Sequence, residues 1–121
     1  MNPRRKRNLI IALLVAIYIV AGFFREFVFV NINELVWLEA RGSYTFVYMQ
    51  DQQKIMVSRT LKEFEDILPF ENFSRVHQSY IINHHFIKKY NRGRGGTIEM
   101  EDGTTIEVSM RKKDEFLSKF K

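Results

Sequence analysis

The stretch that decides the fold of this chain is Phe73-Ser74-Arg75-Val76-His77-Gln78-Ser79-Tyr80-Ile81-Ile82-Asn83. Aromatic and β-branched residues are frequent from 73 to 82, and such residues are typical of strands. Runs of the same kind recur on both sides, separated by polar or glycine-containing breaks, at 34–40, 44–49, 54–57 and 86–90. The sequence therefore predicts a mainly β domain.

The run at 34–40 is the most apolar of these strands. Because side chains alternate along a strand, Leu35 and Trp37 should point to one face, and Val36 and Leu38 to the other. All four side chains are large and apolar. The pattern predicts either burial on both faces or one very apolar face.

Two short helices are expected beside the strands. Thr60 and Glu63 have the spacing of a capping box, in which Thr60 accepts a hydrogen bond from the amide of Glu63. Pro69 should end this first helix. Apolar residues at 116, 117 and 120 predict a second helix that closes the chain.

Glycines mark two connections near the C-terminus. The loop 91–96 contains three glycines and is expected to be mobile, with little to pack. In the last hairpin, a three-residue loop ending in a left-handed Gly103 would pair Ile98 with Ile106. This register keeps the two apolar side chains on one face, so we prefer it to a two-residue turn.

Composition limits the possible functions. The chain has no cysteine, which excludes disulfides, thiolate zinc sites and cysteine nucleophiles. Its net charge of +5 comes mostly from the basic run at 4–7, because from Arg25 onward 15 Lys and Arg stand against 14 Asp and Glu. The overall charge is therefore weak evidence for nucleic-acid binding. Any such surface must come from local clusters, of which there are two: Lys88, Lys89, Arg92 and Arg94, and then Arg111, Lys112 and Lys113.

Residues 1–26 differ in character from residues 27–121. The basic run precedes an apolar stretch at 9–24, which is shorter than the roughly 20 residues that a membrane span requires. Three interpretations stay open: an N-terminal apolar helix that associates with a membrane, a buried or assembly element, and a cleaved signal. If the stretch spans a membrane, the basic run would place the following domain outside the cytoplasm.

The histidines do not indicate a metal or catalytic site. His77 and His84 are an odd number of positions apart and would face opposite sides of a continuous strand, as would His84 and His85. His77 and Ser79 could share a face, but no carboxylate lies nearby in sequence to orient the imidazole. No glycine pattern has the spacing of a phosphate loop. We therefore predict no enzymatic activity, no metal and no cofactor.

The stretch 73–83 resembles the signature of the LytTR family of bacterial DNA-binding domains. Three further segments resemble that family in the same order: Glu34-Leu35-Val36-Trp37-Leu38-Glu39-Ala40 with Gly42-Ser43-Tyr44, Ser58-Arg59-Thr60-Leu61-Lys62-Glu63-Phe64, and Ile106-Glu107-Val108-Ser109-Met110-Arg111. The resemblance implies an elongated stack of small antiparallel β-sheets with one or two short helices. Such domains place loop side chains into successive major grooves, on direct-repeat sites, and bend the duplex.

The resemblance also implies which residues contact DNA. By motif matching, these are Tyr44 after the first block, with Ser43 beside it, Gln78 after the motif histidine, and Arg111 in the final loop. These side chains suit the task, because arginine can bind guanine and glutamine can bind adenine through two hydrogen bonds each.

Other residues of the motifs have supporting roles in this interpretation. Lys112 and Lys113 would lie beside phosphates, although without the resemblance a solvated helix start is the simpler interpretation of that run. Arg75, His77 and Asn83 are expected to set the turns of the motif, with phosphate contacts by Arg75 or His77 as an alternative.

Some features depart from the family pattern. Many relatives carry a basic residue where Gln78 stands, so the preferred DNA sequence should differ. The strand or hairpin that usually precedes the first block is compressed into 27–31. The usual phosphate-accepting receiver domain is missing from this sequence, so regulation by phosphorylation is not implied.

The sequence thus predicts a DNA-binding transcriptional regulator whose partner is double-stranded DNA, with a homodimer on DNA as a further expectation. It would be cytoplasmic, with tethering to the inner face of the membrane through residues 9–24 as an option. Two other classes remain: a membrane-tethered protein-interaction module derived from a DNA-binding domain, and an extracytoplasmic β domain.

Overall fold

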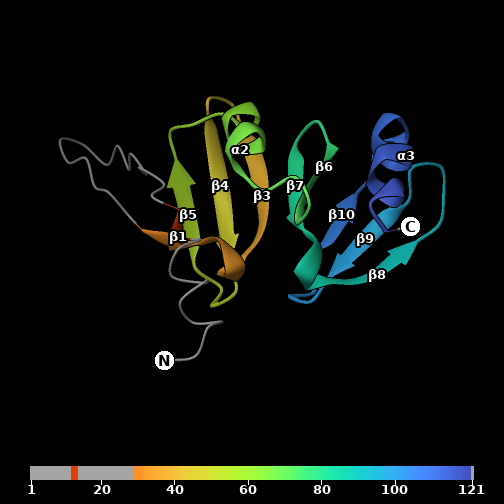
Figure 1. The fold of residues 1–121 in the computed structure, drawn as a ribbon, viewed down its shortest axis with the longest axis horizontal. Coiled ribbons are helices and arrows are strands. Elements are labelled where there is room, and N and C mark those ends of the chain that lie inside the picture. The colour runs from red at the N-terminus through yellow and green to blue at the C-terminus, as the bar shows by residue number, and fades with distance from the viewer. Residues whose placement is uncertain (1–11, 14–28, 121) are drawn as a thin grey trace.

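The computed structural model describes residues 12–13 and 29–120, and Figure 1 shows their fold. In chain order the elements are β1 (Ala12–Leu13), β2 (Val30–Asn31), the 3-10 helix η1 (Ile32–Glu34), β3 (Leu35–Arg41), β4 (Tyr44–Met49), β5 (Lys54–Val57), α2 (Leu61–Ile67), β6 (Phe73–His77), β7 (Tyr80–Asn83), the 3-10 helix η2 (His84–Phe86), β8 (Ile87–Asn91), β9 (Thr97–Met100), β10 (Thr105–Glu107) and α3 (Met110–Ser118).

The strands form small antiparallel sheets. One has five strands in the order β5-β4-β3-β7-β6, a second has three in the order β10-β9-β8, and β1 pairs with β2. Figure 1 shows the two larger sheets side by side along the long axis of the molecule. The prediction of a mainly β fold with small antiparallel sheets and two short helices is confirmed.

β3 departs from the regular alternation that its sequence predicts. A β-bulge lies between Leu35 and Trp37, where β3 uses one residue more than β4. As a result, Leu35 and Leu38 enter one core, whereas Val36 and Trp37 enter the other. The strand is buried on both faces as predicted, but the four side chains are divided between the faces differently because of the bulge.

Two apolar cores join the sheets and helices. The first contains Phe64 of α2 and residues of β3, β4 and β5, and the second contains Phe116 of α3 and residues of β8, β9 and β10. The neighbouring Ile81 and Ile82 of β7 enter opposite cores. Burying one such side chain stabilises a fold by about 1.5–3 kcal/mol. Because β3 and β7 contribute to both cores, the two sheets are held together.

The stretch 73–82 is a hairpin and not one continuous strand. β6 and β7 pair antiparallel on either side of Gln78 and Ser79, with Ser74 opposite Ile82. The polar pair Gln78-Ser79 forms the turn. The sequence does not clearly predict this turn, because aromatic and β-branched residues typical of strands lie on both sides of the pair. This turn matters below because it exposes Gln78.

Of the two predictions made for the glycine-containing connections, one agrees with the structure and the other does not. The register of the last hairpin is confirmed, since Ile98 pairs with Ile106 and Gly103 has a φ of 91°. The loop 91–96, expected to have little to pack, is instead fastened to its surroundings. Gly95 is buried, and a Cβ added there would lie 1.8 Å from the carbonyl oxygen of Val108.

Both predicted helices are present, and α2 begins as the sequence indicates. The Oγ1 atom of Thr60 accepts a hydrogen bond of 3.2 Å from the amide of Glu63, which caps α2. Leu61 and Phe64 are buried, whereas Ile67 is 41% exposed. The predicted closing helix is α3, which buries Phe116.

The predicted N-terminal apolar helix lies outside the described residues, except for Ala12 and Leu13. These two residues form β1 and pair with Asn31 and Val30. No helix in the described part of the chain is long and apolar enough to cross a membrane.

Candidate nucleic-acid interface

Three connections meet along one edge of the molecule: the β3–β4 turn, the β6–β7 turn and the first turn of α3. Figure 1 shows all three on its upper side. Backbone hydrogen bonds fix their order, since the amide of Ala40 donates to Ser79 O at 2.9 Å and the amide of Ser109 donates to Val76 O at 2.8 Å. We call this side of the molecule the turn edge. It brings together predicted site residues that lie far apart in sequence: Ser43, Tyr44, Arg75, His77, Gln78, Arg111, Lys112 and Lys113.

The β6–β7 turn is built by the motif residues on either side of Gln78. His77 Nδ1 accepts a hydrogen bond of 3.0 Å from the amide of Ser79, and Arg75 donates to the carbonyl of Gln78 at 2.7 Å. These two side chains are therefore occupied in shaping the turn, as expected. The side chain of Gln78 is left exposed at its tip.

The β3–β4 turn presents Ser43 and Tyr44. Gly42 has a φ of 60°, a left-handed conformation that glycine adopts without strain. Tyr44 is the first residue of β4 and is 38% exposed. The next residue, Thr45, is buried and donates to the carbonyl of Arg59 at 2.7 Å. The turn is thereby fastened to the segment that precedes α2.

Arg111 lies in the first turn of α3, and not in a loop as the family resemblance implied. Ser109 caps the helix by accepting a hydrogen bond of 3.3 Å from the amide of Lys112. Arg111 is exposed, and Lys112 and Lys113 are half-buried. The run is thus the helix start that its sequence alone suggested, and the helix N-terminus adds a partial positive charge there.

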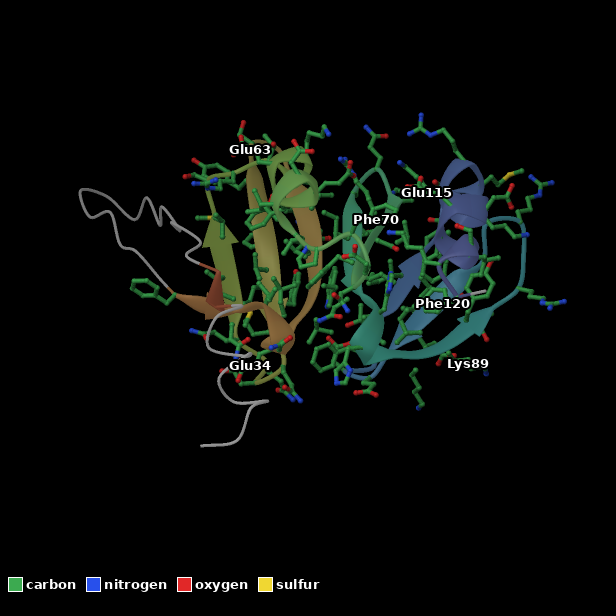
Figure 2. The ribbon with its side chains drawn as sticks, viewed as in Figure 1. Glu34, Glu63, Phe70, Lys89, Glu115 and Phe120 are labelled. Carbon is green, nitrogen blue, oxygen red and sulfur yellow. The ribbon has the colours of Figure 1, made fainter. Side chains whose placement is uncertain are left out.

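The turn edge is basic despite the nearly balanced charge of the domain. Arg59, just before α2, is a further basic residue of this edge that was not predicted from the sequence. Its position immediately before the capping box is the only sequence signal that could have indicated it. Figure 2 shows Glu63 and Glu115 toward this edge, and they pair with Arg59 at 4.0 Å and Lys112 at 3.9 Å. Both contacts are long and partly exposed, so they are weak. Within the described residues, Arg111 and Lys113 take part in no ion pair.

The remaining motif residues hold the hairpin in place away from the turn edge. Asn83 is buried; its amide donates to the carbonyl of Leu35 at 2.8 Å, and its oxygen accepts from the amide of His85. His84 Nε2 lies 2.6 Å from Ser74 Oγ. Burial lowers the pKa of His84, and the nearby Lys119 lowers it further. No cluster of potential metal ligands occurs among the residues that the structure describes.

A small β domain that exposes a glutamine, an arginine and basic side chains along one edge has the features of a nucleic-acid-binding domain. The model of the LytTr DNA-binding domain matches residues 25–121, and the chain belongs to this family. The match confirms the family that the sequence motifs resemble, and with it the general class of DNA-binding regulator.

A solved structure supports the same assignment. The chain is similar to the "LytTr DNA-binding domain of putative methyl-accepting/DNA response regulator from Bacillus cereus", with 25% sequence identity and a TM-score of 0.74. The match covers 88% of this chain and 95% of that one. No curated protein is similar enough to match the chain.

Proposed function

We propose that this protein is a sequence-specific transcriptional regulator that reads the major groove of DNA with its turn edge and catalyses no reaction. The observation that supports this most strongly is the convergence of three sequence-distant connections on that edge. Backbone hydrogen bonds of 2.8 and 2.9 Å fasten the β6–β7 turn to α3 and to β3. A surface fixed in this way can match several bases at once.

The exposed side chains suggest a division of roles. Arg111 would bind guanine and Gln78 would bind adenine, each through two hydrogen bonds. Tyr44 would reach a base edge or a phosphate with its hydroxyl, and Ser43 lies beside it in the turn. Arg75 and His77, which already shape the β6–β7 turn, would contact phosphate only with the polar atoms that remain free.

Basic residues around these contacts would set affinity and register. Lys112 and Lys113 lie at the N-terminal end of α3, where a phosphate also gains from the helix dipole. Arg59 would extend the same backbone contact beyond the β3–β4 turn. Such contacts weaken as salt rises and carry no sequence information.

The resemblance to the family suggests how the complex is organised. Each chain would occupy one half of a direct repeat on a bent duplex, and two chains would form a homodimer on DNA. The protein would act in the cytoplasm, where its DNA is, and residues 9–24 would tether it to the inner face of the membrane. Apart from Ala12 and Leu13, which form β1, that segment lies outside the described residues.

A selection from random-sequence duplexes with the full chain at fixed salt tests the proposal. We expect enrichment of a repeated motif with a guanine that Arg111 reads. Arg111→Ala should then cost about 1–3 kcal/mol on the enriched site and far less on random DNA. Lys113→Ala should weaken both about equally. Lys54→Ala is the control. Lys54 is the first residue of β5, away from the turn edge, so this substitution should change neither the affinity for the enriched site nor that for random DNA.

The selection can also refute the proposal. Equal losses on specific and random DNA for Arg111→Ala would mean that Arg111 contacts only phosphate. Failure to enrich any motif, with a folded protein, would favour the membrane-tethered protein-interaction module instead, and a search for a protein partner would follow.

A further inference from the structure

The β8–β9 loop carries two arginines that the proposed turn edge does not use. Arg92 and Arg94 flank Gly93, and all three residues are exposed. In the described part of the chain, neither arginine takes part in an ion pair. Two free guanidinium groups separated by one glycine are well suited to bind a surface of concentrated negative charge.

The loop is fastened beside the start of α3. The amide of Val108 donates to Gly96 O at 3.0 Å, and the hydroxyl of Tyr90 donates to Gly95 O at 2.8 Å. Gly95 approaches the backbone of Val108 and Ser109 so closely that no Cβ fits. Ser109 is the N-cap of α3, so the anchor of the loop lies two residues before Arg111.

The loop therefore continues the turn edge at one end. Figure 1 shows the β3–β4 turn, the β6–β7 turn and the start of α3 in that order, with the β8–β9 loop beyond α3. On one side of a duplex a minor groove follows a major groove after half a helical repeat, or roughly 17 Å. If Arg111 enters a major groove, the loop, which lies beyond α3, would be the part of the chain nearest to the minor groove on that side.

We propose that Arg92 and Arg94 bind a narrow, A·T-rich minor groove that flanks the major groove contacted by Arg111. A·T tracts narrow the minor groove and strengthen its negative potential, which attracts arginine. Gly93 has no side chain and only ordinary contacts around it, so the backbone between the arginines can approach the groove floor closely. This inference rests on the proposed function and adds a second, sequence-dependent contact to it.

The experiment varies the flank of the enriched site while the site itself stays constant. Each flank in turn is made of A·T pairs, G·C pairs or inosine·cytosine pairs. Inosine lacks the guanine 2-amino group, so an inosine·cytosine pair presents an A·T-like minor groove and a G·C-like major groove. Affinities of the full chain are measured at one salt concentration. We expect A·T and inosine·cytosine flanks on one side to bind at least about fivefold more tightly than G·C flanks.

Variants assign the preference to the loop. Arg92→Ala with Arg94→Ala should abolish the flank preference and keep selectivity for the site itself. Arg92→Lys with Arg94→Lys keeps the charge but should lose most of the preference, because a strongly hydrated ammonium group enters a narrow groove less readily than guanidinium. Lys88→Ala removes one exposed charge from β8 and should keep the preference.

The two proposals fail in different ways. Three results would overturn the minor-groove contact alone. The first is equal affinity for the three flanks, and the second is a preference in which inosine·cytosine behaves like G·C. The third is a preference that survives the double alanine variant. Lysine variants that retain the full preference would overturn it too, since positive charge alone would then account for the preference. Failure of the wild-type chain to select any site would overturn the proposed function and this inference together.

Discussion

Replacing Gly95 with alanine should destabilise the protein through a clash that no side chain can relieve. The added Cβ would lie 1.8 Å from Val108 O, 2.9 Å from Val108 C and 3.0 Å from Ser109 C. All three are backbone atoms. The β8–β9 loop must therefore move away from β10 until these contacts are ordinary ones.

The expected magnitude follows from the hydrogen bonds that this movement breaks. The bond from Val108 N to Gly96 O crosses the gap that must widen, and the bond from the Tyr90 hydroxyl of β8 holds the carbonyl of Gly95, the residue that must move. Each contributes about 0.5–1.5 kcal/mol, so their loss costs about 1–3 kcal/mol. Alanine also lowers the conformational entropy of the unfolded chain, which offsets about 0.4–1 kcal/mol of this loss in the free energy of unfolding.

Gly93→Ala is the matched control in the same loop. A Cβ there would meet nothing closer than 3.8 Å, so the substitution should leave stability unchanged or raise it slightly. Thermal unfolding of both variants should give a Tm for Gly95→Ala about 5–20 °C below that for Gly93→Ala, because 1 kcal/mol shifts a domain of this size by about 4–8 °C. Equal Tm values would refute the view that the loop is anchored on β10 and α3.

Substitutions at three further positions test other parts of the fold. Asn83→Ala should lower the free energy of unfolding in urea by about 1–3 kcal/mol, because it leaves the carbonyl of Leu35 without its donor; a smaller loss would mean that water replaces the amide. Thr60→Ala should cost about 1 kcal/mol through loss of the α2 cap, and Thr60→Ser should restore most of it. Burial lowers the pKa of His84 in the folded state below its usual value near 6.5. The unfolded chain therefore binds more protons below that pH, and stability should be full above it and decline as pH falls through it. His84→Gln should weaken this decline, and an unchanged pH profile would show that His84 does not cause it.

The sequence predicts β3, β4 and β5 well because each is short, largely apolar and bounded by polar or glycine-containing breaks. It also predicts the register of the last hairpin, since only one loop length places Ile98 opposite Ile106. It does not predict the bulge in β3. All four residues from Leu35 to Leu38 are large and apolar, so nothing in their order distinguishes a regular strand from a bulged one.

The candidate site is predicted less completely, and for a different reason. Family resemblance identifies Gln78 and Arg111 as candidate DNA-contacting residues, but it places Arg111 in a loop. In the structure Arg111 lies in helix α3, whose N-cap is Ser109. The position of Arg59 beside the β3–β4 turn depends on Thr45, which is 14 positions earlier in the chain and donates a hydrogen bond to the carbonyl of Arg59. Contacts of this kind are set by tertiary packing, and no local sequence pattern encodes them.

Within the motifs, the residues that shape the site differ from those that would read DNA. His77 and Arg75 direct polar atoms to backbone groups of the β6–β7 turn, so replacing either would change the shape of the turn edge. Asn83 donates to the carbonyl of Leu35 away from that edge, so replacing it would weaken the attachment of the hairpin to β3. Gln78 and Arg111 are exposed, and no described hydrogen bond or ion pair engages their side chains. Substitution at these two positions could therefore change which bases are read at little cost in stability.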